Sequence, residues 1–396
     1  MSDLNLSGTT VSGLSPSGTV ASGPSVPSVP GSAVKGGAGP APGARWRRPV
    51  AALGAGVILF AIPLYADRFW LNLGAFAFAA AVGAIGLMIL LGRVGQLSLA
   101  HSFFLAVGAY GYIWLASPAS ESTWGLGLPT LPAAVIAVVL AGLAGLAFSP
   151  LAGRLKGIYL GVASLALVFI GQHVLFTAEP LTGGYNGREV PPLTVGAFQV
   201  LGSEPGLSLF GVPLRQAERM WYTALIVLIL ATVFAVLVLR SRVGRAFAAI
   251  RDGEVHAAAL GVRVAHYRSV AFTLSSVYAG IAGVLLALLF QRVVPEYWDL
   301  MLSLEYLAMV VIGGQASVAG AVAGAVFVSS LPLLLQRYSD LVPGMSATSD
   351  FGPAYVAQIL YGTLVVAILF YEPKGLAEVA RRARRALGGR AASTPR

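Results

Sequence analysis

The sequence predicts an all-α polytopic membrane protein with about ten transmembrane or re-entrant helices. Of its 396 residues, 57% are hydrophobic and only 11% are charged, whereas soluble domains contain about 25% charged residues. The apolar runs are unbroken and approach the roughly 20 residues that a helix needs to cross a bilayer. They lack the alternation of apolar and polar residues that is typical of membrane β-barrels. Composition and run length together therefore predict a bundle of membrane helices.

Ten segments have the composition of such helices. They cover residues 49–66, 73–92, 97–117, 131–150, 157–177, 220–239, 269–291, 302–313, 318–335 and 354–371. The segment 302–313 is short, and the small-residue run GGQASVAGAVAGA begins at its end. We expect it to be a half-helix or re-entrant segment, which requires protein on all sides because lipid cannot satisfy its backbone.

The distribution of basic residues predicts the orientation. With the N-terminus in the cytoplasm, this layout places 20 of the 26 Lys and Arg residues inside and 6 outside, as the positive-inside rule requires. The Gly- and Pro-rich segment 178–219 then lies outside and segment 240–268 lies inside. We expect residues 1–44 to be a disordered Ser/Gly/Pro-rich cytoplasmic tail, residues 45–372 to be the transmembrane domain, and residues 373–396 to be a basic amphipathic cytoplasmic tail. The predicted location is a bacterial cytoplasmic membrane, with both termini in the cytoplasm.

The inner segment 240–268 is charged, rich in alanine and helical in pattern. Its apolar and small residues recur at three- and four-residue spacing with charged residues between them. These positions are Phe247, Ile250, Ala257, Ala258 and Gly261. The pattern predicts a short helix on the cytoplasmic face that either docks into a groove on a partner protein or lies on the lipid surface.

Several chemistries have no sequence support. The three lysines, Lys35, Lys156 and Lys374, are each followed by Gly without the Ser or Thr of a phosphate-binding loop. The chain has no cysteine and no histidine pair at metal-ligand spacing. We therefore expect no catalytic residue, metal site or cofactor in this chain, and no ATPase site of its own. A membrane enzyme is the third of our hypotheses, because no catalytic constellation is visible.

Ionisable residues are nearly absent from the predicted spans, and Glu305 is the clearest one. Ion-coupled carriers usually keep such residues at depth in the membrane. A stand-alone channel or ion-coupled carrier is therefore only the second hypothesis. If the chain moves a solute uphill, we expect the energy to enter from elsewhere, through the cytoplasmic segment.

The stretch GQLSLAHSFFLAVGAYG, residues 95–111, places polar and small residues inside an apolar region. Polar side chains at such positions either line a solute path or form hydrogen bonds between helices. The candidates for the path are Gln96, Ser98, His101, Gln172, Ser275 and Tyr278. The glycines that we expect to break or closely pack helices are Gly95, Gly108, Gly313 and Gly314. The tetrapeptide at 95–98 also echoes Gly-Gln-Ala-Ser at 314–317, and transporters often contain structural repeats.

Three segments carry a family resemblance. The stretch 95–111, the segment RSRVGRAFAAIRDGEVHAAALGV from residue 240, and the long C-terminal half from residue 271 resemble the permease subunits of branched-chain amino acid ABC transporters. The resemblance covers roughly residues 50–385 in the right order, and it is closest to the second of the two permease types of that importer family.

The resemblance implies a fold similar to that of the many-helix sugar and cobalamin importers. It implies a second homologous permease, two cytoplasmic P-loop ATPase subunits that bind ATP and Mg²⁺, and an extracytoplasmic solute-binding protein that delivers leucine, isoleucine or valine. Relatives that carry urea, other small amides or other amino acids leave the solute open. The net charge of +10 indicates membrane topology and contact with anionic membrane lipids, not nucleic-acid binding.

The resemblance also implies that the ATPases dock on the loop helix. The positions carried over are Gly244, Arg245, Arg251, Glu254, Ala258 and Gly261. Small residues let a partner groove approach the backbone, and the arginines can meet carboxylates or helix C-termini. The loop departs from the best-known importer pattern, Glu-Ala-Ala followed by Gly and Ile-x-Leu-Pro, because no Leu-Pro follows Gly261.

Overall fold

The computed structural model describes most of the chain between residues 59 and 338. The described residues are 56, 59–121, 123–155, 157–195, 198–199, 208–209, 212–213, 215–315, 317–338, 359, 362–363 and 366–367. The two predicted tails lie outside this set, and so do half of the predicted span 49–66 and most of the predicted span 354–371. The predictions for those segments therefore stay predictions.

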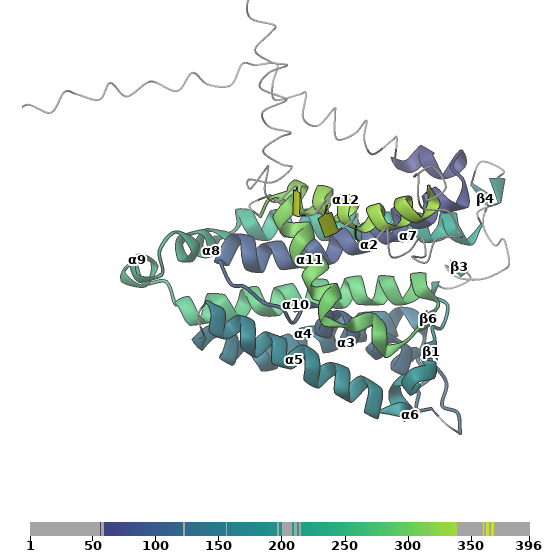
Figure 1. The fold of residues 1–396 in the computed structure, drawn as a ribbon, viewed down its shortest axis with the longest axis horizontal. Helices are drawn as coiled ribbons and strands as arrows, with labels where there is room; N and C mark the ends of the chain where they lie inside the picture. The colour runs from purple at the N-terminus through teal and green to yellow at the C-terminus, as the bar shows by residue number, and fades with distance from the viewer. Residues whose placement is uncertain are drawn as a thin grey trace, which may run out of the picture. The chain divides into compact units, whose positions relative to one another are not determined.

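Long helices dominate the described part of the chain (Figure 1). The α-helices are α2 (Arg68–Leu87), α3 (His101–Ala116), α4 (Thr130–Arg154), α5 (Ile158–Thr177), α6 (Glu179–Thr182), α7 (Gln216–Arg240), α8 (Arg242–Asp252), α9 (Glu254–Ala259), α10 (Val264–Phe290), α11 (Leu300–Gly313) and α12 (Val318–Arg337). A π-helix, η2 (Met88–Val94), continues α2, and the 3₁₀ helices are η1 (Ile62–Leu64), η3 (Gly184–Asn186) and η4 (Pro295–Trp298). The strands are β1 (Arg188–Glu189), β2 (Thr194–Val195), β3 (Phe198–Gln199), β4 (Ser208–Leu209), β5 (Val212–Pro213) and β6 (Arg292–Val293).

The helices confirm the predicted fold class. Six helices of the described residues are long and apolar enough to cross a membrane: α2 with η2, α4, α5, α7, α10 and α12. Helix α11 is shorter, with 14 residues, and its assignment as a half-helix or re-entrant segment stays a prediction. The predicted span 97–117 is wrong at its start, because α3 begins only at residue 101.

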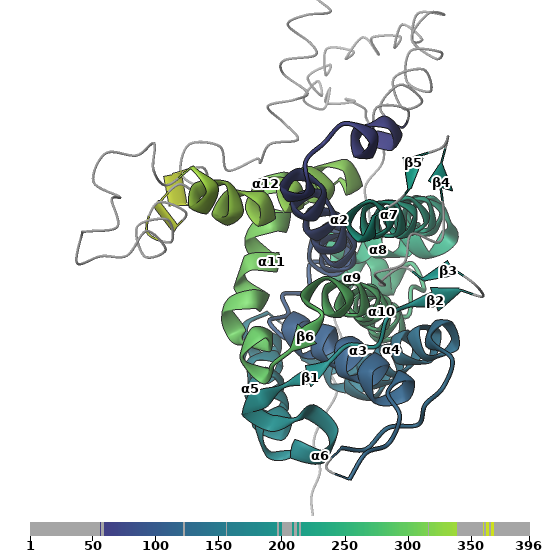
Figure 2. The same ribbon diagram turned by 90° about the vertical axis from the view of Figure 1, so that its right-hand side faces the viewer.

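Helices α2 and α10 form the centre of the bundle. In the most apolar stretch of each helix, 89% of the residues are buried for α2 with η2 and 72% for α10, against 28% for α4, α5, α7 and α12. Figure 2, which looks along the helices, shows α7 beside α2, α3 and α4 beside α10, and α11 and α12 along one flank. The apolar residues that face outward on α4, α5 and α7 are those expected to face lipid or another membrane protein.

The two ends of the bundle differ in structure (Figure 1). Helices α8 and α9 lie together at one end, and α6 with the paired strands β1 and β6 lies at the other. Here the buried Arg188 side chain donates to the carbonyls of Trp124 at 2.7 Å and Leu181 at 3.0 Å, and burial lowers its pKa. The segments predicted to lie on opposite sides of the membrane, 178–219 and 240–268, therefore lie at opposite ends of the bundle.

Candidate functional site

The first break in a helix lies between η2 and α3. Gly95 ends η2 in the left-handed region with φ 77°, a conformation that glycine adopts without steric cost. The Gln96 side chain then donates to the Ala152 carbonyl of α4 at 2.9 Å. The Leu99 N–H donates to the Ser164 hydroxyl of α5 at 2.8 Å, and the Ala100 N–H donates to the Ser98 hydroxyl at 3.3 Å. Polar side chains thus replace the backbone partners that a helix would supply, which an interrupted chain inside a membrane requires.

The second break separates α11 from α12. Gly314 follows α11 with φ 105°, and the Ser317 hydroxyl accepts a hydrogen bond from the Gly320 N–H at 2.9 Å, which caps α12. A Cβ atom at Gly313 would lie 2.1 Å from the Gly320 carbonyl oxygen, so the turn admits only glycine there. The two breaks, at residues 95–98 and 314–317, therefore share two features: a glycine with positive φ follows the helix, and a serine hydroxyl then accepts a hydrogen bond from a backbone N–H further along.

Gly92 brings the π-helix into contact with the second break. A Cβ atom at Gly92 would lie 1.7 Å from the Gln315 carbonyl oxygen, so the two backbones touch. Gly92 belongs to η2, which has seven residues. π-helices are rare, usually single turns, and often lie at functional sites. The contact joins the segment before α3 to the segment after α11.

Arg251 of α8 reaches the same place. Its guanidinium donates to the Gly92 carbonyl, so this predicted docking residue binds the chain's own central helix. Behind it, Phe247 and Ile250 are buried, with exposed fractions of 0% and 4%, and Ala257 of α9 is buried too. Three of the five positions that the sequence pattern singled out, Phe247, Ile250 and Ala257, therefore pack inward, whereas Ala258 and Gly261 stay exposed. Docking of this segment on a partner stays a prediction. The inward packing fixes α8 to the end of α2.

The other predicted docking residues have mixed surroundings. A Cβ atom at Gly244 would lie 2.2 Å from the Leu239 carbonyl oxygen, so this glycine serves the corner between α7 and α8. Glu254 forms a two-pronged ion pair with Arg268 of α10, with both N–O distances 3.1 Å. Arg245, Ala258 and Gly261 are exposed, and Gly261 turns the chain with φ 82°.

Two exposed apolar residues of this loop were missed from the sequence. Val255 and Leu260 are 80% and 81% exposed. Val255 lies three residues before Ala258, and Leu260 lies three residues after Ala257, so both fit the helical spacing and were left out of the pattern. Large apolar side chains at helical spacing in a charged segment were the available signal. Next to them, a hollow of about 330 Å³ is lined by Arg242, Arg245 and Arg263 among others, and no acidic residue lines it.

Helices α3 and α11 face each other through polar groups. The Ser102 N–H donates to the Ser303 hydroxyl at 2.9 Å, and the two hydroxyl oxygens lie 2.8 Å apart. The His101 ring lies on the Tyr306 ring, with centroids 4.7 Å apart. All four side chains are buried, with exposed fractions of 3% or less. We call this contact between α3 and α11 the polar seam.

Only some of the predicted path residues gather at the seam. His101 lies in it, and Gln96 and Ser98 lie in the break just before it. The Tyr278 hydroxyl donates to the Ala231 carbonyl of α7 at 2.7 Å, which is an interhelical bond. Ser275 is buried in α10, and Gln172 is half-buried toward the C-terminal end of α5. Gly108 packs against Gly280 of α10, since a Cβ atom there would lie 2.4 Å from the Gly280 carbonyl oxygen.

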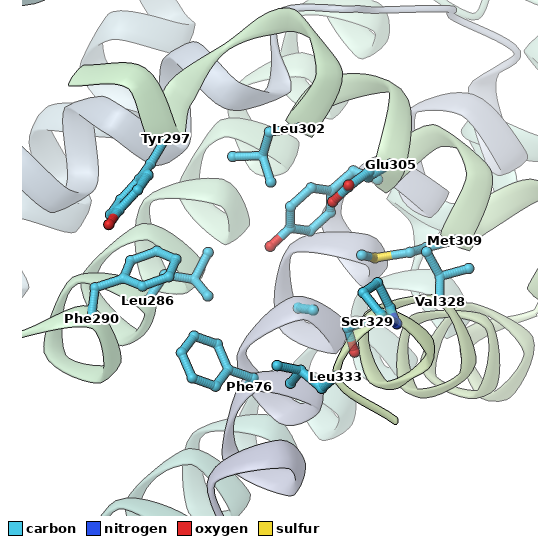
Figure 3. Close-up of a pocket in the computed structure, with 13 residues that line it drawn as sticks. Phe76, Leu286, Phe290, Tyr297, Leu302, Glu305, Met309, Val328, Ser329 and Leu333 are labelled. Carbon is cyan, nitrogen blue, oxygen red and sulfur yellow. The ribbon is translucent and has the colours of Figure 1, made fainter. Parts of the chain in front are cut away.

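Glu305 lines an apolar pocket of about 270 Å³ between α2, α10, α11 and α12 (Figure 3). It is the one residue of the types Asp, Glu, His, Lys and Arg in the pocket lining. The lining residues are Phe76, Ala80, Leu286, Phe290, Tyr297, Leu302, Glu305, Tyr306, Met309, Val328, Ser329, Pro332 and Leu333. In the part of the chain that the structure describes, no three His, Asp or Glu residues gather in a way that could hold a metal ion.

Comparison with known proteins places the chain in a family. The family model described as branched-chain amino acid transport system / permease component matches residues 69–369. The permease protein LivM of the high-affinity branched-chain amino acid transport system of Salmonella typhimurium is 29% identical over 336 residues, covering 82% of this chain and 74% of the relative. The probable branched-chain amino acid transport permease LivM of Methanocaldococcus jannaschii is 28% identical over 265 residues, covering 65% and 70%.

A second type of permease is also similar. LivH, the other permease protein of the high-affinity system in Escherichia coli K12, is 25% identical over 270 residues, covering 65% of this chain and 84% of the relative. No solved structure matches the chain. The broken helices, the membrane bundle and these matches agree, and the chain belongs to the family of permease subunits of branched-chain amino acid ABC transporters.

Proposed function

We propose that the protein is the membrane-spanning subunit of an ABC importer that carries leucine, isoleucine and valine, driven by ATP hydrolysis on separate subunits. The family match and the printed names of its relatives support this solute. Urea, another small amide or a different amino acid is the alternative solute for the same architecture. The importer lies in the cytoplasmic membrane of a bacterium with the α8–α9 end inside, because the basic residues of segment 240–268 favour that side.

The proposed partners follow from the same family. The chain is similar to both LivM and LivH, which supports pairing with a second, related permease. Two P-loop ATPase subunits bind ATP and Mg²⁺ and dock at the α8–α9 end. A solute-binding protein docks at the opposite end, where α6, β1 and β6 lie.

The observation that carries the proposal is the α8–α9 end itself. It presents Val255 and Leu260 to the outside and holds a basic hollow beside them. Exposed apolar residues next to uncompensated positive charge suit a partner that has an apolar groove and acidic residues. The same end binds the central helix through Arg251. A displacement of segment 240–268 is therefore transmitted through Arg251 to Gly92 and to the two helix breaks, before α3 and after α11.

A reconstituted complex with its ATPases and binding protein tests the proposal by ATP-dependent uptake of labelled leucine into proteoliposomes. Uptake by this chain alone, without any ATPase, contradicts it. Within the complex, Leu260→Glu places a charge in the proposed contact and is expected to prevent co-purification of the ATPases. Competition of leucine uptake by urea and by other amino acids decides the solute.

Arg251→Gln is expected to act differently from Leu260→Glu. It removes the bond to the Gly92 carbonyl while leaving Val255 and Leu260 in place, so the complex assembles and hydrolyses ATP but leucine uptake falls. Arg240→Gln is the matched control, because it removes the same charge from an exposed position at the end of α7 that does not line the basic hollow. Normal uptake by Arg251→Gln, together with normal assembly of Leu260→Glu, would overturn the docking assignment.

A further inference from the structure

The polar seam contains buried polar atoms without partners. Among the described residues, no group meets hydrogen-bond geometry with His101 Nε2, Tyr306 OH, Tyr110 OH or Trp298 Nε1. These four side chains are 3% exposed or less. Tyr110 lies on α3 next to the Trp298 indole, which closes η4 just before α11, but the Tyr110 hydroxyl and the indole N–H miss hydrogen-bond geometry with each other. Each buried polar group that is left without a hydrogen bond lowers the stability of the fold by about 1–3 kcal/mol. Several such groups close together therefore indicate a role other than stabilising the fold.

Both helices of the seam are held firmly on their other sides. Where α3 meets α10, a Cβ atom at Gly108 of α3 would lie 2.4 Å from the Gly280 carbonyl oxygen. A Cβ atom at Gly283 of α10 would lie 2.0 Å from the Leu105 carbonyl oxygen of α3. On α11, the Met309 carbonyl oxygen lies 2.0 Å from a Cβ built on Gly324 of α12. Glycine contacts of this kind join backbone to backbone over a short distance. The seam joins the two helices through polar side chains instead.

We propose that α3 and α11 part along the polar seam during transport and that the seam's unpartnered polar atoms then contact the solute. The solute class is a small molecule with a hydrogen-bonding head group and an apolar body. The ammonium and carboxylate of an amino acid can pair with His101, Tyr306, Tyr110 and Trp298, and the aromatic rings offer apolar surface. This inference rests on the proposed function, because it takes the solute to be an amino acid.

The two breaks provide the hinges for this movement. The first lies immediately before α3, and the second lies immediately after α11. Glycines with positive φ at both breaks can absorb a change of backbone direction. The Gly92–Gln315 contact joins the breaks to each other, and Arg251 joins them to the α8–α9 end. One movement of the loop therefore reaches both sides of the seam.

A disulfide across the seam tests the proposal, because the chain has no native cysteine. Ser102→Cys with Ser303→Cys replaces two hydroxyls whose oxygens lie 2.8 Å apart, close enough for a disulfide with little backbone movement. The matched control is Thr130→Cys with Thr194→Cys, whose hydroxyl oxygens lie 2.9 Å apart between α4 and β2, away from the seam. Both pairs are oxidised in the reconstituted complex, and uptake of labelled leucine is measured before and after reduction.

We expect oxidation to abolish uptake in the seam pair and reduction to restore it, while the control pair transports in both states. Uptake by the crosslinked seam pair at the rate of its reduced form would overturn the proposal. A seam pair that never crosslinks overturns it too, because the facing arrangement of Ser102 and Ser303 would then be wrong.

A second readout does not depend on leucine. Ser303→Cys alone is labelled with a small charged methanethiosulfonate reagent, and labelling is expected to be faster during ATP turnover than at rest. Unchanged labelling overturns the proposal even if the reduced seam pair does not transport. If the unmodified complex takes up no leucine but labelling still responds to ATP, the proposed solute fails and the seam proposal stands.

Discussion

The two sides of α3 are packed in opposite ways. Toward α10, Gly108 and Gly283 let the two backbones touch, and the Phe104 ring of α3 packs on the Phe272 ring of α10. Toward α11, serine hydroxyls, an imidazole and tyrosine rings fill the contact, and several of their polar atoms have no partner among the described residues.

The difference indicates that the α3–α10 contact stabilises the fold, whereas the polar seam between α3 and α11 can rearrange. Backbone contacts through glycine lose energy steeply when they are displaced, because close-packed interiors leave no room. Polar side chains can exchange their partners for water or solute at little net cost, since a hydrogen bond formed within the protein adds only about 0.5–1.5 kcal/mol over one to water. The molecule therefore contains a rigid pair, α3 with α10, beside a seam that can open.

Adding one methyl group to the rigid side of α3 is expected to have the largest effect. In Gly108→Ala the new Cβ meets the Gly280 backbone at 2.4 Å, which overpacks the contact and costs about 1–3 kcal/mol. Gly111→Ala on the same helix is the control, because its Cβ meets the Ala137 side chain at 3.4 Å, an ordinary contact. Thermal unfolding in detergent should show a clearly lower Tm for the first variant only. Equal Tm values would mean that the glycine contact is not tight.

Removing one hydroxyl from either of two buried tyrosines is expected to have a smaller effect on stability than Gly108→Ala. Tyr278→Phe removes a hydroxyl that donates to Ala231, and it should lower the stability by about 0.5–1.5 kcal/mol with little effect on uptake. Tyr306→Phe removes a buried hydroxyl that has no partner in the described chain. Its stability should stay the same or rise, while leucine uptake falls.

Paired measurements of Tm and of the KM for uptake distinguish the two tyrosine variants. The account is contradicted if Tyr306→Phe loses stability as Tyr278→Phe does and transports leucine normally. In that case the seam would be an ordinary structural contact.

The sequence predicted the bundle well, because long apolar runs and the placement of arginines depend only on the bilayer. The short α11 and the two glycine-containing breaks were also visible as composition. The start of α3 was not, because four residues of the apolar run 97–117 stay unwound when the Ser164 and Ser98 hydroxyls accept from the Leu99 and Ala100 N–H groups. No local pattern in the sequence shows which distant side chain will supply such a bond.

The candidate site was predicted only in part. His101 was singled out, but its neighbours Tyr306 and Ser303 lie about 200 residues away in the chain and have the composition of any membrane helix. The periodicity of segment 240–268 marked buried positions, such as Phe247 and Ile250, together with the exposed Ala258 and Gly261. Periodicity predicts a helix without showing which of its faces the rest of the chain covers.

The most direct test of the account is the distance between spin labels across each side of α3 in the reconstituted complex. One pair joins Ala119, just after α3, to Met301 of α11, and the other joins Ala119 to Phe290 of α10; all three residues are exposed. Between the nucleotide-free state and a state trapped with ATP, the account predicts a changed Ala119–Met301 distance and an unchanged Ala119–Phe290 distance. Equal changes in both pairs, or a change in the Ala119–Phe290 pair alone, would contradict it.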